Sequence, residues 1–152
     1  MRSIFRAPAH ALVLALTTAT LAPAMAGSDV AHAQAMPNTY VEAGMIVVSA
    51  IDRYEMAGVW EAASPVMKGS VPQERFIANI AQKRALLGAI RSREWLSVMK
   101  LPVTAQNGGL PPGQYVSVRF ATTGANGRTM EEVISFRLDD DAQWRLVGYS
   151  LN

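Results

Sequence analysis

The 152-residue chain has no cysteine, and its only histidines are His10 and His32, both near the N-terminus. Without cysteine it can form no disulfide. If the N-terminal segment is removed, the chain also lacks the residues of Cys- or His-based zinc sites and of His-dependent catalytic triads. Neither a Walker phosphate-binding loop nor a Gly-x-Gly-x-x-Gly sequence occurs. We therefore expect no cofactor and no metal, and an enzyme would depend on carboxylates, Lys, Tyr, Ser or Arg.

The N-terminus has the layout of a secretory signal peptide. Arg2 and Arg6 precede the apolar run ALVLALTTATLA (11–22), which small residues follow. The run is shorter than the roughly 20 residues that cross a bilayer. Small residues at alternate positions permit cleavage after Ala26 or, alternatively, after Ala35.

These sites predict the domain organisation. We expect a signal peptide at 1–26 (alternative end 35), a disordered segment at 27–37 and a single domain at 38–152. The mature protein is expected in the periplasm or secreted, without stable membrane insertion once the signal is cleaved.

Removal of the signal also changes the charge balance. The 14 Lys and Arg include Arg2 and Arg6, so cleavage before Gly27 leaves 12 of them against 12 Asp and Glu. Cleavage before Met36 also removes Asp29 and leaves a net charge of +1. The basic pI of the whole chain is thus partly a property of the signal, and no nucleic-acid partner is expected.

Two stretches have the apolar periodicity of helices. The first runs from the capping-box pattern at 39–42 to Ser64-Pro65, and Asp52 points away from its apolar face. The second begins with Ser70 as its cap and ends at Gly88 as a left-handed stop. The expected buried residues are Tyr40, Gly44, Val47, Ile51, Tyr54 and Gly58 in the first helix, and Phe76, Ile77, Ile80 and Leu87 in the second.

After Gly88 the apolar period changes to two, which is typical of strands. Short connections rich in Gly or Asp separate the last three segments and indicate an antiparallel meander. The fold class is therefore α+β, with two N-terminal helices packed on a curved four-stranded antiparallel sheet. The expected strands are 93–101, 114–123, 129–138 and 143–151.

Four segments together resemble a bacterial family, domain of unknown function 4019. They are VWEAASPVMK (59–68), RFIANIAQKRALLGAIRSREW (75–95), PPGQYVSVRFATT (111–123) and WRLVGYSLN (144–152). The resemblance implies a small exported α+β domain of the cystatin-like or nuclear-transport-factor-2-like kind. It implies no particular reaction, substrate or cofactor.

Two arginines are expected near the core. Arg84 lies four residues after Ile80 and three before Leu87, on the apolar face of the second helix, and Arg93 shares a strand face with Trp95. A buried guanidinium needs a partner. One interpretation is that both arginines bind an anionic ligand; the other, which we favour, is that they pair with carboxylates and tie the helix to the sheet. The candidate carboxylates are Glu61, Glu94 and Glu132.

Two acidic groups offer further candidates. Glu131 and Glu132 point to opposite faces of a strand, so they cannot form a catalytic dyad, and Glu132 is expected to pair with an arginine. The acidic run 139–141 is expected to be a solvated hairpin turn, since calcium needs six to eight spaced oxygens.

Eight aromatic residues at core spacings form either the core or the lining of a ligand pocket: Tyr54, Trp60, Phe76, Trp95, Phe120, Phe136, Trp144 and Tyr149. The candidate ligand-binding residues are Arg84, Arg93, Trp60, Trp95 and Glu132, and no catalytic residue is assigned.

Two functions remain open from the sequence. The first is an exported, non-enzymatic module that binds a protein or a small ligand in the cell envelope. The second is a small hydrolase or isomerase that uses a buried carboxylate, for example Glu132 or Glu94, beside Tyr and Arg. The absence of Cys, of His and of metal-ligand spacing favours the first.

Overall fold

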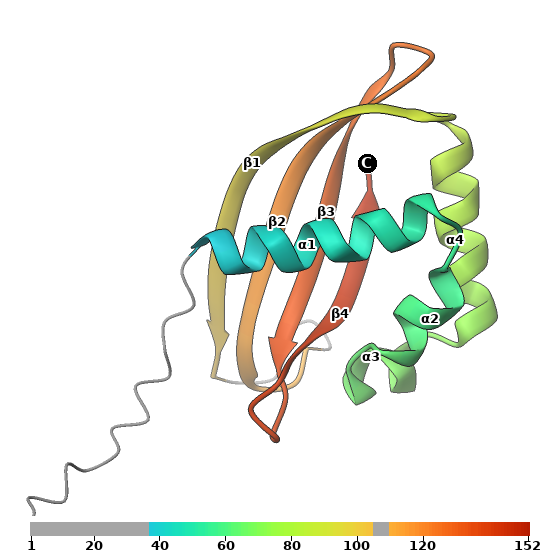
Figure 1. The fold of residues 1–152 in the computed structure, drawn as a ribbon. Helices are drawn as coiled ribbons and strands as arrows, with labels where there is room; N and C mark the ends of the chain where they lie inside the picture. Colours follow the sequence, from blue (N-terminus) through green and yellow to red (C-terminus); the bar gives the residue numbers. More distant parts are fainter. Residues whose placement is uncertain (1–36, 105–109) are drawn as a thin grey trace, which may run out of the picture. The chain divides into compact units, whose positions relative to one another are not determined.

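The computed structural model describes residues 37–104 and 110–152, and these form an α+β domain (Figure 1). The predicted signal peptide and nearly all of the predicted disordered segment lie outside the described residues. Four helices precede four strands in the described part of the chain. The helices are α1 (Pro37–Asp52), α2 (Met56–Glu61), α3 (Pro65–Ser70) and α4 (Gln73–Ala85), and the strands are β1 (Ile90–Val103), β2 (Gly113–Gly124), β3 (Thr129–Leu138) and β4 (Trp144–Leu151).

The strands form one antiparallel sheet in the order β1-β2-β3-β4, which confirms the predicted meander. The pairing places Trp95 opposite Phe120, Phe120 opposite Glu132, and Glu132 opposite Leu151. Because directly opposed residues share a face, these four side chains belong to the same side of the sheet. A bulge follows Trp95 on β1, and the strands bend visibly in Figure 1.

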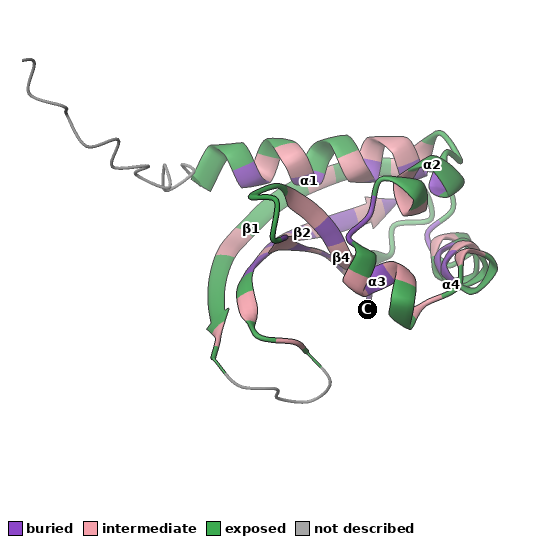
Figure 2. Ribbon diagram, turned by 90° about the horizontal axis from the view of Figure 1, so that it is seen from below, coloured by how far each residue is buried: buried purple, intermediate pink, exposed green. Residues whose placement is uncertain are grey.

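The helices cover one face of this sheet and bury its alternating apolar residues. Helix α1 packs against β1 and β2, whereas α3 and α4 pack against β4. Figure 2, in which buried residues are purple, shows them gathered where helices and strands face one another. The fully buried sheet residues include Val116, Val118, Phe120 and Ile134. Burial of apolar area at this helix–sheet interface supplies the main favourable term for folding.

The prediction of one continuous first helix is wrong. Helix α1 ends at Asp52, and Tyr54 adopts a left-handed conformation (φ 62°) with 86% of its surface exposed instead of joining the core. Two short helices follow. The Ser64-Pro65 pair, expected to end a helix, begins α3 instead, because the Ser64 hydroxyl accepts a hydrogen bond from the backbone N–H of Val66.

The predicted buried face of the first helix is also partly wrong. Val48 is fully buried where Val47 was expected, and Gly58 is exposed. Tyr40, Gly44 and Ile51 are buried as expected.

Helix α4 follows the prediction more closely. Phe76, Ile80 and Leu87 are buried, and Gly88 adopts the expected left-handed conformation (φ 67°). Ser70 does not cap this helix: it is the last residue of α3, and Pro72 occupies the N-cap position of α4. Among the helices of the described residues, none has the length and apolar character that a membrane span requires.

Candidate functional site

Four charged side chains from four different elements meet at one end of the domain. Asp52 is the last residue of α1, Arg84 lies in the last turn of α4, Arg93 lies on β1, and Glu132 lies on β3. We call these four residues the ion-pair cluster. Their formal charges cancel.

Glu132 is the centre of the cluster and is completely buried. Its Oε2 accepts hydrogen bonds from Arg93 Nε (2.6 Å) and from the hydroxyl of Thr122 (2.6 Å). Its Oε1 accepts one from the hydroxyl of Tyr149 (2.6 Å) and a longer one from Arg84 Nη1 (3.4 Å). Each carboxylate oxygen therefore receives two donors, which is close to the full accepting capacity of an ionised carboxylate.

Asp52 completes the cluster on its more open side. Arg93 donates two hydrogen bonds to this carboxylate, from Nη1 to Oδ2 (2.8 Å) and from Nη2 to Oδ1 (2.9 Å). Arg84 Nη2 also donates to Oδ1. The side chain of Asp52 is 31% exposed, against 14% for Arg84 and 8% for Arg93. Helices α1 and α4 both end at the cluster, and their C-terminal carbonyl groups favour the two cations there.

The surroundings fix the protonation states. Burial alone would raise the pKa of Glu132, but the hydrogen bonds from Arg93, Thr122 and Tyr149 together outweigh burial and hold this pKa below its ordinary value. Burial, together with the neighbouring charge of Glu132, raises the pKa of Tyr149. At neutral pH the carboxylate is therefore ionised and the phenol is neutral and donates.

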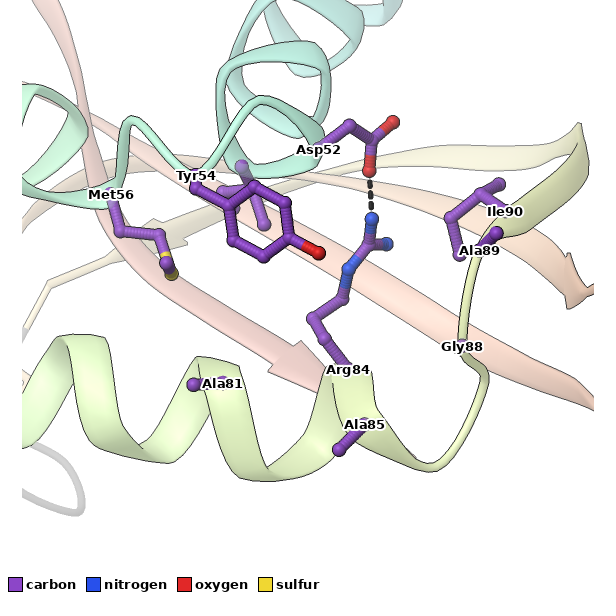
Figure 3. Close-up of a pocket in the computed structure, with 10 residues that line it drawn as sticks. Asp52, Tyr54, Met56, Ala81, Arg84, Ala85, Gly88, Ala89 and Ile90 are labelled. Atoms are coloured by element: carbon purple, nitrogen blue, oxygen red, sulfur yellow. Dashed lines mark hydrogen bonds and ion pairs between the residues drawn. The ribbon is translucent and has the colours of Figure 1, made fainter.

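A cavity of about 500 Å³ opens beside the cluster between the ends of α1 and α4 (Figure 3). Asp52 and Arg84 form its charged wall, and the Tyr54 side chain stands on one side with its hydroxyl directed toward Arg84. The remaining lining is largely apolar: Ile51, Met56, Ala81, Ala85, Gly88, Ala89 and Ile90.

A family model described as "Protein of unknown function (DUF4019)" matches residues 43–149, which include the whole ion-pair cluster. The chain belongs to the DUF4019 family. No curated protein and no solved structure matches it.

The structure brings together three of the five predicted ligand-binding residues of this DUF4019 domain. Arg84, Arg93 and Glu132 meet in the cluster, and both arginines pair with Glu132, one of the three candidate carboxylates. Trp60 and Trp95 are not among the residues that line the cavity. The indole of Trp60 donates to the carbonyl of Val71 (2.9 Å), and Lys68 lies over its ring, whereas Trp95 is 55% exposed on β1.

Sequence reasoning missed the second carboxylate of the cluster. Asp52 was expected to point away from the core, whereas Glu61 and Glu94, the other candidate partners, are exposed and do not join the arginines. Helix α1 ends at Asp52, directly after the buried residue Ile51. At this helix end the Asp52 side chain reaches Arg93 on the edge strand β1. Tyr149 was predicted only as one of the aromatic residues of the core or of a pocket, and Thr122 was not singled out, so neither was expected to donate to Glu132.

The other acidic residues have structural partners. Glu131 points to the opposite face from Glu132, as predicted, and pairs there with Arg119. The prediction of a wholly solvated turn at 139–141 is wrong for Asp139, which is buried and accepts hydrogen bonds from Ser64, Arg137 and Arg145. Within the described residues no group of side chains is arranged to hold a metal ion.

Proposed function

We propose that this DUF4019 protein is an exported, non-catalytic binding module of the bacterial cell envelope, with a cystatin-like or nuclear-transport-factor-2-like arrangement of helices on a curved sheet. The N-terminal layout of two arginines, an apolar run and small residues supports export to the periplasm or the medium. The fold proposal is supported by helices that pack on one face of a bent antiparallel meander.

One observation carries the choice of binding over catalysis: Glu132 already accepts four hydrogen bonds. A general base needs a free lone pair directed at the proton it removes, and a general acid at neutral pH needs a raised pKa. Glu132 has its oxygens occupied and its pKa lowered. The arrangement therefore disfavours a hydrolase or isomerase that would use this carboxylate.

The cavity beside the cluster supports the binding half of the proposal. Ligand sites in proteins are typically concave and mostly apolar, with a few polar groups that orient the ligand. This cavity combines largely apolar walls with Asp52 and Arg84. The site therefore fits a small ligand best, and a protein partner is the alternative. The balanced charge of the mature chain gives no support to nucleic-acid binding.

Titration of the buried carboxylate tests the non-catalytic part. In ¹³C NMR of the purified protein, with Glu132→Gln used to assign the signal, the carboxyl of Glu132 should titrate below the ordinary glutamate range. A Glu132 pKa near neutrality would overturn the proposal and restore the acid–base enzyme.

Export is tested separately. N-terminal sequencing of the protein from periplasm or medium should give Gly27 or, alternatively, Met36 as the first residue. Recovery of the chain in the membrane fraction with Met1 intact would contradict it.

A further inference from the structure

We infer that the cavity between the ends of α1 and α4 binds a small zwitterion with an apolar side chain, the chemistry of an apolar α-amino acid. The inference rests on the proposed function as a binding module and adds the class of ligand. It is carried by two features, a charged wall of both signs and an apolar remainder, and an aromatic residue stands at the side of the cavity.

The charged wall presents a cation and an anion in direct contact. Arg84 Nη2 touches Asp52 Oδ1, and both residues line the cavity. A guanidinium has five N–H groups. Within the described residues Arg84 Nη1 donates to Glu132 and Nη2 donates to Asp52, whereas Nε donates to neither carboxylate. On the Asp52 carboxylate, Oδ2 accepts from Arg93 Nη1. Both groups therefore retain hydrogen-bonding capacity toward a ligand.

The neutrality of the cluster decides the charge of that ligand. Two cations and two carboxylates cancel, so a ligand with one net charge would bring an unbalanced charge into a partly buried site, at a cost in desolvation. An apolar ligand would leave the spare donors of Arg84 and the spare acceptor of Asp52 without partners. An uncharged polar ligand would form weaker hydrogen bonds there than a charged one. A carboxylate on Arg84 and an ammonium on Asp52 satisfy both. Because the two protein groups touch, the ligand's charges must also be adjacent, as on one α-carbon.

The rest of the cavity suits an apolar side chain. Branched or flexible apolar side chains line it at Ile51, Met56 and Ile90. The lining from α4 includes two small residues, Ala81 and Ala85. A volume of about 500 Å³ lies in the range of small-molecule sites and exceeds what a single amino acid of moderate size fills.

Tyr54 lies at the side of the cavity, where it ends helix α1. It adopts the left-handed conformation (φ 62°) of a Schellman cap, in which the N–H of Glu55 donates to the carbonyl of Ala50 and the N–H of Tyr54 donates to that of Ile51. This turn places an exposed aromatic ring against the cavity, with its hydroxyl directed toward Arg84 (Figure 3). The ring is therefore placed where it would contact a ligand in the cavity.

The charge requirement is tested with L-leucine as the probe. Isothermal titration and ¹⁵N NMR should show L-leucine binding with shifts at 51–56, 81–85 and 88–90, the segments that line the cavity. N-acetyl-L-leucine lacks the ammonium and L-leucinamide lacks the carboxylate. Each should bind at least about tenfold more weakly, since a hydrogen bond to a charged group is lost.

Equal binding of either analogue would overturn the zwitterion assignment and leave the cavity as a binding site, so the proposed function would stand. Absence of L-leucine binding at millimolar concentration would also overturn the assignment. The pKa of Glu132 is measured without ligand. A value near neutrality would therefore count against the non-catalytic function, whatever the result of the leucine titration.

The location is tested with two matched substitutions on α4. Ala81 lines the cavity and Ala78 does not, and both are exposed alanines of the same helix. Ala81→Phe should fill the cavity and reduce leucine affinity at least about tenfold, whereas Ala78→Phe should leave it unchanged. Equal affinities for the two variants would place the ligand elsewhere.

A second pair separates binding from folding. Tyr54→Gly should raise the melting temperature, because it removes the left-handed strain, and should weaken leucine binding. Ala142→Gly relieves a similar strain (φ 61°) outside the cavity lining and should raise the melting temperature without changing affinity. Unchanged leucine affinity in Tyr54→Gly would remove Tyr54 from the site and contradict the inference.

Discussion

Replacement of Arg93 by methionine should be the most damaging single change in the ion-pair cluster. Arg93 donates one hydrogen bond to Glu132 and two to Asp52, and its side chain is almost completely buried. Methionine keeps much of the apolar stem but leaves Glu132 buried with an uncompensated charge. Removal of one partner from a buried pair costs about 3–5 kcal/mol. Thr122 and Tyr149 still donate to Glu132, which places the expected loss near the lower end of that range.

Urea unfolding of the purified protein, followed by circular dichroism, measures this loss. For an m-value of about 2 kcal/mol/M, a loss of about 3 kcal/mol lowers the midpoint by roughly 1.5 M. Arg84→Met should cost less, because its contact with Glu132 is longer and Asp52 is partly exposed. Arg119→Met is the matched control: Arg119 pairs with Glu131 on the other face of the sheet, where both side chains are partly solvated, and little change is expected.

The pH dependence identifies the cause. In the native protein the pKa of Glu132 is lowered, so its contribution to stability is present above the unfolded-state pKa and is lost as the pH falls through the native value. In Arg93→Met, burial should instead raise this pKa. The penalty of the substitution should then begin to shrink as the pH falls through the raised pKa of the variant, above the unfolded-state value of about 4.3, and should shrink further below that value as the wild-type protein loses its own contribution. A loss that is independent of pH, or no larger than that of Arg119→Met, would refute the reasoning.

Three further substitutions test other contacts. Gly124→Ala should destabilise the domain strongly in thermal unfolding, because a Cβ there would overlap the carbonyl of Leu87; wild-type stability would contradict this. Asp139→Asn should lower the urea midpoint more than Asp140→Asn, since Asp139 is buried among three donors and Asp140 is solvated; equal effects would show that the buried contacts contribute little. Tyr149→Phe should cost about 1–3 kcal/mol by removing a donor from the buried carboxylate, as measured by urea unfolding, and a cost below 0.5 kcal/mol would count against the hydrogen bond.

The sheet could be predicted from sequence because its signals are local. Each strand alternates apolar and polar residues with period two, and the observed strands β2, β3 and β4 begin and end within one residue of the predicted limits. Strand β1 extends further at both ends. Its polar and exposed residues weaken the alternation there, since it lies at the edge of the sheet.

The helix boundaries could not be predicted equally well. The apolar spacing continues through Tyr54 and Gly58, so nothing local marks the end of α1 at Asp52. The Ser64-Pro65 pair is compatible with both the end of one helix and the start of another, because proline is disfavoured after a helical residue and favoured in a first turn. Packing against the curved sheet decides between them.

The candidate site was predictable only in part, for a related reason. Arg84 and Arg93 could be placed near the core from helix and strand periodicity, and Glu132 could be chosen as a partner because it shares a face with apolar residues. Asp52 became accessible to the same arginines only because α1 ends at that residue. The cavity lies beside the break between α1 and α2, which the sequence does not indicate, so the cavity could not be predicted either.

The separation in sequence between the members of the ion-pair cluster has a consequence for folding kinetics. The strands pair with their neighbours in the chain, so each hairpin can close locally, whereas the ion pairs join residues 32 to 48 positions apart. Contacts between distant positions form only after much of the chain entropy is lost. We expect the cluster to form after the folding transition state, so that it slows unfolding more than it speeds folding. If the protein is exported as proposed, a slow unfolding rate prolongs the lifetime of its native state among proteases.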